Sequence, residues 1–130
     1  MEPKWLSLRM ARAMHTEAVA VFGGSPEMRD EGLFESALQR PRNLYAYGEN
    51  PSLFGLAAAH CRGIVKNHPF LDGNKRTGLL AANAFLALNG YEFRPTEADA
   101  ATIIMALAAG ELEEDILARW FSDYSTPAPR

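Results

Sequence analysis

Residues 79–88 are the most apolar stretch of the sequence, and they constrain the fold more than any other feature. They lie inside a helical pattern over about residues 74–89, and Gly90 follows as a residue type that commonly ends a helix. A helix that is apolar nearly all round must be covered by neighbours on several sides. We therefore predict that this segment is the central and most buried helix of the molecule.

Other segments also show helical spacing of apolar residues, with capping or helix-breaking residues at their ends. The spacing predicts helices over about residues 7–22, from Asp30 to just before Pro41, from Ser52 to Asn67, from Thr96 to Gly110, and from residue 111 onward. Residues 91–94 are expected to be a short extended connector, and residues 125–130, with two prolines, a flexible tail. The sequence thus predicts an all-α domain over residues 1–124, a compact bundle of six to seven helices.

Length and charge exclude several classes of protein. A chain of 130 residues can bury one sizeable core but not two, which indicates a single domain. With 13 basic and 16 acidic side chains the net charge is −3, which argues against direct nucleic-acid binding. No apolar run approaches the roughly 18 residues typical of a membrane span, and residues 1–8 lack the apolar core of a signal peptide. We therefore expect no membrane contact. The single cysteine, Cys61, has no partner for an internal disulfide, so we also expect a cytoplasmic protein.

Residues 68–76 carry the chemistry of this sequence. A loop from His68 to Gly73 leads into the first turn of the apolar helix, where Lys75 and Arg76 follow. The start of a helix offers unpaired N–H groups and a partial positive charge, so two cations there are unfavourable unless an anion lies among them. Gly73 lets a ligand approach the backbone closely because it has no Cβ. This arrangement favours a polyanion such as the phosphate chain of a nucleotide.

The same loop supplies groups that can act on a bound phosphate. Asp72 is a hard oxygen ligand of the kind that holds Mg²⁺ beside phosphate oxygens. His68 can accept a proton near neutral pH, as a base that activates a hydroxyl must. Together these groups suit the transfer of a phosphate-containing group to a hydroxyl.

Each of these residues has an ordinary explanation when it is taken alone. A His-Pro pair before a helix is commonly a turn, and a Lys-Arg pair is commonly solvated surface; the nine residues together are not explained in this way. Elsewhere the ordinary interpretation holds: Cys61 is expected to be a small buried side chain, and His15, His60 and Cys61 lack the spacing of a metal site.

The run His68-Pro-Phe-Leu-Asp-Gly-Asn-Lys-Arg76 resembles the signature of the Fic/Doc family, His-x-Phe-x-acid/Asn-Gly/Ala-Asn-Gly/Lys-Arg. Lysine in the eighth position is similar to the Doc (death-on-curing) toxins, whereas the Fic adenylyltransferases carry glycine there. Residues 29–38 and 85–90 are also similar to Doc-type sequences, so the resemblance covers about residues 5–122.

The resemblance implies a role for each matching position. His68 would be the general base that deprotonates a target hydroxyl, Asp72 would hold Mg²⁺, and Phe70 would anchor the loop in the core. The remaining motif residues would bind and neutralise the phosphates: Gly73, Asn74, Lys75 and Arg76.

The resemblance to Doc implies a kinase that uses ATP, with the γ-phosphate presented to a threonine of elongation factor Tu, and hence inhibition of translation. Adenylyltransferase members usually carry a second arginine three residues after the first, where this sequence has Leu79, so the sequence favours phosphorylation over transfer of AMP. Two alternatives stay open: an adenylyltransferase of the same fold, and a catalytically silent module that binds an antitoxin.

Two partners also follow from the resemblance. The family places its target-docking flap near residues 41–50, where the run 44–47, with Leu44, Tyr45 and Tyr47, can be extended and pair with a substrate strand. An ordinary loop whose tyrosines cover the core is equally consistent with these residues. The inhibitory helix of some Fic proteins is not evident, so restraint by an external, Phd-like antitoxin is expected.

Overall fold

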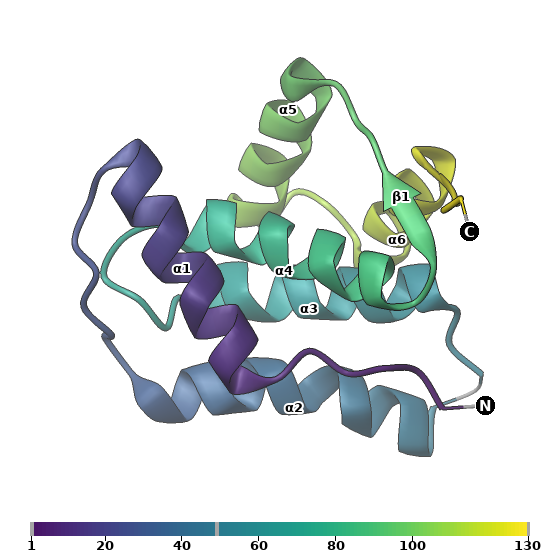
Figure 1. Cartoon of the computed structure of the whole chain (residues 1–130), viewed down its shortest axis with the longest axis horizontal. Helices are drawn as coiled ribbons and strands as arrows, with labels where there is room; N and C mark the ends of the chain where they lie inside the picture. Colours follow the sequence, from purple (N-terminus) through teal and green to yellow (C-terminus); the bar gives the residue numbers. More distant parts are fainter. Residues whose placement is uncertain (1, 49, 130) are drawn as a thin grey trace.

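The computed structural model describes residues 2–48 and 50–129, and within them it contains six helices and two short strands (Figure 1). The elements in chain order are α1 (Leu8–Phe22), α2 (Glu31–Tyr47), α3 (Leu53–Asn67), α4 (Asn74–Leu88), β1 (Tyr91–Phe93), α5 (Glu97–Ala108), α6 (Glu114–Asp123) and β2 (Ser125–Pro127). The all-α class is therefore confirmed. Residue 49 of the expected connection and residues 1 and 130 at the ends lie outside the described residues.

Polar side chains determine where four of the helices begin. Ser7, Asp30, Ser52 and Thr96 each accept a hydrogen bond from the backbone N–H three residues further on. Such a bond satisfies one of the donors that the first turn leaves free, so it favours a helix start at that residue. The starts predicted from these residues are confirmed.

The central helix is α3, not α4 as the sequence predicted. Figure 1 shows α2, α3 and α4 stacked with alternating chain directions, with α3 between the other two. The consecutive residues Ala57, Ala58 and Ala59 point to different sides of α3 and are all fully buried, so neighbours cover this helix on several sides. On α4, by contrast, Leu80 of the apolar run is exposed beside α1. Apolar content identified a core helix, but the contacts of α3 with α2, α4 and α6 place α3 in the middle.

Helix α2 continues through Pro41 to Tyr47, so the predicted end before the proline is wrong. A proline inside a helix costs about 3 kcal/mol through a lost hydrogen bond and a steric clash. Packing offsets this cost here: Pro41 is buried, Leu44 packs against the core, and Tyr45 meets Trp5 edge-to-face with ring centroids 5.7 Å apart. The run 44–47 is therefore the last turn of a helix and not an extended flap.

The segment expected to be a frayed tail instead begins with a strand. β2 pairs with β1 in antiparallel register, with Glu92 opposite Thr126, and the N–H of Ala128 donates to Gly90 O at 2.8 Å. Proline is tolerated in β2 because each strand of this small sheet has only one neighbour.

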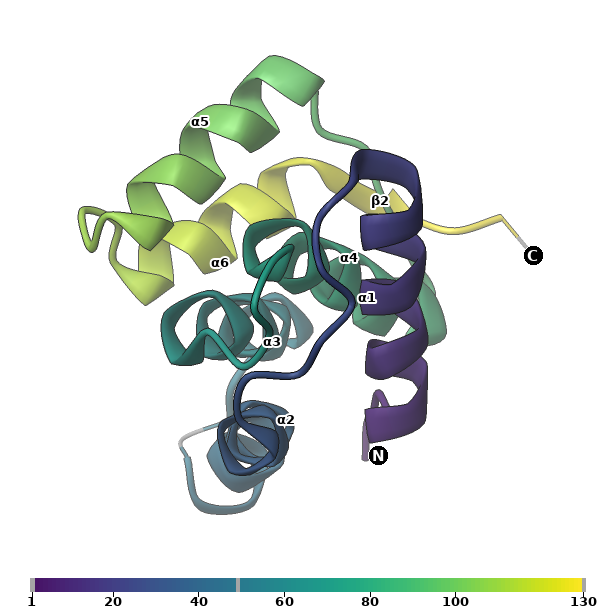
Figure 2. The same ribbon diagram turned by 90° about the vertical axis from the view of Figure 1, so that its left-hand side faces the viewer.

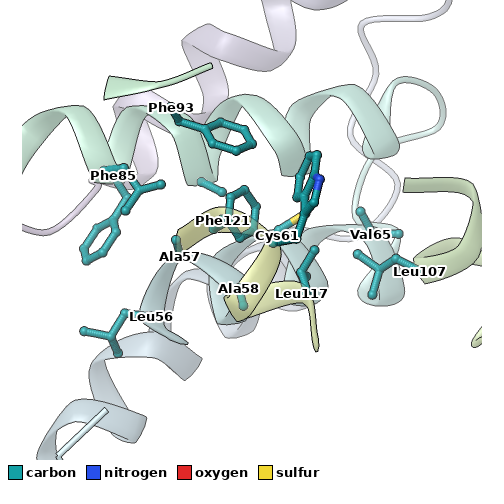
Figure 3. Close-up of a cluster of buried hydrophobic side chains, with 13 residues drawn as sticks. Leu56, Ala57, Ala58, Cys61, Val65, Phe85, Phe93, Leu107, Leu117 and Phe121 are labelled. Atoms are coloured by element: carbon teal, nitrogen blue, oxygen red, sulfur yellow. The ribbon is translucent and has the colours of Figure 1, made fainter. Parts of the chain in front are cut away.

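Two clusters of buried side chains lie on the two sides of α3. The larger cluster draws on α3, α4, α5, α6 and β1, and Figure 3 shows it around Cys61, Phe93 and Phe121. The smaller joins α1 and α2 to α3 and α4, and it includes Phe70 from the loop between α3 and α4. Among the described residues, no helix combines the length and apolar character needed to cross a membrane.

Candidate active site

His68 ends helix α3 in a left-handed backbone conformation, with φ 52° and ψ 55°. This conformation is uncommon for a residue other than glycine and needs support from its surroundings. Arg29 provides it: its Nε donates to the carbonyl oxygen of His68 at 2.6 Å and its Nη2 to that of Asn67 at 2.8 Å. These bonds satisfy carbonyl groups left free at the helix end, and the His68 side chain stays exposed.

The segment 23–30, between α1 and α2, lies along the loop 68–73; Figure 2 shows these two connections side by side. The backbone N–H groups of Arg29 and Asp30 donate to Pro69 O at 2.7 and 2.9 Å, and Leu71 N–H donates to Glu27 O at 3.0 Å. Met28 and Phe70 form an isolated antiparallel bridge. The loop thus has a paired backbone although it belongs to no sheet.

Asn74 holds the loop from the side of α4. Its side-chain oxygen accepts from Phe70 N–H at 3.0 Å, and its side-chain nitrogen donates to Phe70 O at 2.9 Å. Asn74 was expected to line the phosphate site, but its amide side chain is buried and bonded to Phe70. It can offer a ligand only its backbone N–H at the start of the helix. Phe70 itself is 1% exposed, which agrees with its predicted role as the anchor of the loop.

Asp72 is exposed at the end of the loop, and its carboxylate has a defined direction. Oδ2 accepts from Ser25 N–H at 2.7 Å, which leaves Oδ1 for other partners. Gly24, with φ +111°, lies so close that a Cβ there would sit 2.9 Å from Asp72 Cβ. Glycine at position 24 is therefore required both by its backbone conformation and by the approach of Asp72.

The first turn of α4 is electrically unbalanced, as the sequence indicated. Gly73, with φ +80°, provides no side-chain cap, and the turn contains no acidic residue. Lys75 is exposed, and the Arg76 guanidinium lies 3.4 Å from the centre of the exposed Phe22 ring in a cation–π contact. The turn therefore presents free N–H groups together with two cations, an arrangement that favours an anion.

The motif residues meet at one cavity of about 620 Å³. His68, Asp72, Gly73, Asn74, Lys75 and Arg76 contribute to its wall, together with Phe22, Gly23 and Gly24 from the end of α1. Its volume is in the range of small-molecule sites. The cavity therefore brings a possible base, a carboxylate and two cations to a helix start, which is a composition suited to chemistry on a phosphate chain.

The residues proposed for target docking are not at this cavity. Asp30, next to the site, precedes α2, whereas Leu44, Tyr45 and Tyr47 lie at its other end, after about 20–25 Å of helix at roughly 1.5 Å per residue. The segment beside the loop is instead 23–30, whose signal in the sequence is Gly23-Gly24-Ser25-Pro26, shortly before Arg29. The sequence analysis used the two glycines only as a helix stop and missed their approach to Asp72.

Two buried groups in the core carry shifted pKa values. Cys61 is buried, as predicted, and burial raises the pKa of its thiol to about 12, so the side chain is protonated. Burial lowers the pKa of His60 to about 4, although a hydrogen bond to Leu56 O acts in the opposite direction. Both groups are buried away from the exposed His68.

Comparisons with known proteins show which family this chain resembles. A sequence model of the Fic/DOC family matches residues 5–86. The chain is 40% identical over 78 residues to Toxin Doc of Mycolicibacterium smegmatis, an alignment that covers 59% of this chain and 60% of the relative. It is 33% identical over 100 residues to Protein kinase doc of Escherichia phage P1, covering 77% of this chain and 79% of the relative. The match thus spans about three-fifths of the first relative and about four-fifths of the second.

Proposed function

This chain belongs to the Doc branch of the Fic/DOC family, and from that premise we propose that it is a protein kinase toxin. In this proposal it transfers the γ-phosphate of ATP to a threonine hydroxyl of a translation factor such as elongation factor Tu. The name of the phage relative, Protein kinase doc, supports this reaction class. The observation that carries the proposal is the shared cavity of His68, Asp72 and Lys75 at the uncapped start of α4.

The groups of the cavity suffice for phosphoryl transfer. An imidazole nitrogen of His68 takes the proton of the threonine hydroxyl as its oxygen forms a bond to the γ-phosphorus. The bond from that phosphorus to the β,γ-bridging oxygen breaks, and ADP leaves. Lys75, Arg76 and the N–H groups at the start of α4 offset the charge that builds up on the phosphates.

Magnesium fits the carboxylate of this site. The described residues contain no group of three or more His, Cys, Asp or Glu side chains that could enclose a metal. Mg²⁺ bound with a nucleotide usually takes one or two protein carboxylates, with phosphate oxygens and waters as the other ligands. Asp72, with Oδ2 oriented by Ser25 and its place beside the phosphate site, meets that requirement. When bound, Mg²⁺ would neutralise charge on the phosphate oxygens.

Two positions favour the γ-phosphate over the α-phosphate. Lys75 places a long cationic side chain at the cavity where a glycine would leave space. Leu79, at the position of the second arginine of adenylyltransferases, is half-buried and packs against the larger core cluster, so it adds no cation to the site. Both features support phosphorylation, and transfer of AMP is the alternative that the experiment must separate.

The test uses ATP labelled at either the α- or the γ-phosphate, with purified elongation factor Tu as the acceptor. We expect label on a threonine only from γ-labelled ATP, and none with His68→Ala. Label retained from the α position would overturn the kinase assignment in favour of adenylylation. If His68→Ala inhibited growth as strongly as the parent protein, the toxic activity would instead come from binding alone.

We further infer a partner, a Phd-like antitoxin that restrains the kinase. The name of the mycobacterial relative, Toxin Doc, supports this partner. A short reading frame next to the gene should encode a protein that co-purifies with this chain and relieves growth inhibition. A neighbouring product that neither binds nor protects would argue against the pairing.

A further inference from the structure

We propose that His15 is a positioning residue of the candidate site, which it serves from inside the core. His15 belongs to α1, far in sequence from the motif, and no role was expected for it from the sequence. It is 1% exposed, yet it contacts the loop of the site through both its ring face and its ring nitrogen. The inference rests on the proposed function, because the site is taken to bind Mg²⁺ and ATP, but its test does not require phosphate transfer.

The ring of His15 fixes the anchor of the loop. It lies parallel to the Phe70 ring, with 3.6 Å between ring centroids and 6° between planes. Phe70 stands midway between His68 and Asp72 in the chain, and Asn74 holds its backbone on both sides. The stacking therefore adds a side-chain contact to a residue whose main chain is already bonded.

The ring nitrogen of His15 fixes the peptide that joins the loop to α4. His15 Nε2 lies 2.7 Å from the carbonyl oxygen of Asp72. A carbonyl oxygen can only accept, so Nε2 must carry a proton, as it does in one neutral tautomer and in the imidazolium form. The same ring lies against Gly73, where a Cβ would be 3.5 Å from His15 Cδ2.

This peptide lies between two functional groups, the carboxylate of Asp72 and the first turn of α4. Asp72 supplies both this carbonyl and the carboxylate, so a fixed carbonyl limits the movement of the Cα that carries the carboxylate. The next residue, Gly73, is the N-cap of α4, and its orientation affects the direction of the N–H groups of the first turn. His15 thus acts on the site through Asp72 and Gly73, without touching a ligand itself.

The second buried histidine shows what an ordinary core histidine does in this fold. His60 donates from Nδ1 to Leu56 O within its own helix, and its ring lies at a tilt of 30° to the Phe85 ring of the larger cluster. His15 instead donates its hydrogen bond to Asp72, a residue of the site that lies 57 positions away in the chain. Replacing His60 is therefore the matched control for loss of a buried imidazole.

The experiment compares His15→Gln, which keeps a donor at the reach of Nε2, with His15→Phe and His15→Leu, which remove it. Calorimetry measures ATP binding with and without Mg²⁺. We expect both apolar variants to lose about tenfold or more of the Mg²⁺-dependent gain in affinity, a size typical of losing a group that orients a metal ligand. His15→Gln should retain most of it, and the control His60→Leu should bind as the parent does.

A second measurement needs no ligand. The amides of Phe70 and Leu71 are hydrogen-bonded, so they should exchange slowly in the parent protein and about tenfold faster in the apolar variants. The proposal would be overturned if the Gln variant and the apolar variants had equal ATP affinity and equal amide exchange rates. It would also be overturned if both apolar variants were unfolded, because the ring would then serve only the stability of the core. A parent protein that binds Mg²⁺·ATP but transfers no phosphate would overturn the proposed function and leave the role of His15 intact.

Discussion

At the scale of single residues, the groups that react and the groups that hold the loop are different. His68, Asp72 and Lys75 are exposed at the cavity. The backbone between residues 67 and 72 is held by the side chains of Arg29, Asn74 and His15. Fixed backbone geometry lets exposed side chains keep a defined position without being buried, which is a condition for catalysis by orientation.

The close approach of Gly24 to Asp72 gives a prediction for the residue scale. Gly24→Ala should displace Asp72, because the new Cβ would lie 2.9 Å from Asp72 Cβ. The matched control is Gly23→Ala, which also substitutes a glycine of positive φ but meets no atom within 4 Å. We expect Gly24→Ala to lose about tenfold or more of the Mg²⁺-dependent affinity for ATP, as for other disturbed metal ligands, with a clearly smaller loss for Gly23→Ala. Similar losses in both variants would show that backbone strain, and not the approach to Asp72, is the cause.

At the scale of the elements, the sequence predicted helices well where local signals decide their ends. Caps at Asp30, Ser52 and Thr96 and the break at Gly23 are local, and the structure follows them. The passage of α2 through Pro41 is not local, since it depends on contacts with residues distant in the chain, such as Trp5.

The candidate site likewise has one part that the sequence could predict and one part that depends on the tertiary fold. The nine motif residues are contiguous, so it could be predicted that most of them would line one cavity. The segment 23–30 and His15 reach the loop only through the tertiary fold, and no spacing in the sequence shows that approach. Likewise, the pairing of β2 with β1 joins segments more than 30 residues apart.

The contact between α3 and α4 gives a prediction for this scale. Gly78 lies so close to α3 that a Cβ there would meet Val65 Cγ2 at 2.8 Å and Cys61 O at 3.0 Å. Gly78→Ala should therefore push the two helices apart and lower the free energy of unfolding by about 1–3 kcal/mol, the usual cost of overpacking. The control is Gly55→Ala in α3, where the nearest atom is 3.5 Å away and alanine should stabilise by up to about 1 kcal/mol. Urea unfolding at neutral pH measures both, and a Gly78→Ala variant as stable as the parent would contradict the close packing.

At the scale of the whole molecule, α3 joins the two clusters and carries a buried ionisable group, His60. Its Nε2 has no hydrogen-bond partner among the described residues, and its Nδ1 is bonded to Leu56 O. The imidazole is therefore neutral in the folded protein at physiological pH, since its pKa is lowered to about 4.

This burial predicts how stability depends on pH. The unfolded chain protonates His60 near its ordinary pKa of about 6.5, whereas the folded chain does so only near 4. Between these two pH values the unfolded state therefore binds more protons than the folded state. His60 has no effect on the free energy of unfolding above about pH 6.5, and it lowers that free energy as the pH falls towards 4. We expect a loss of about 2 kcal/mol from this group between pH 8 and pH 5.

His60→Leu isolates that contribution from the carboxylates, which titrate in both proteins. Denaturant unfolding at pH 8, 6.5 and 5 should show that the parent loses more stability than the variant as the pH falls. Parallel curves for the two proteins would mean that His60 is accessible to protons in the folded state.

The separation between reacting groups and supporting groups has a consequence for how such proteins diverge. Because main-chain bonds and the side chains of His15, Arg29 and Asn74 fix the path of the loop, exchange of His68 or Lys75 would leave that path unchanged. Descendants of one ancestor can therefore change or lose their reaction while their architecture is preserved. An inert copy would still present the same surface to the proposed antitoxin and would compete for it with an active copy.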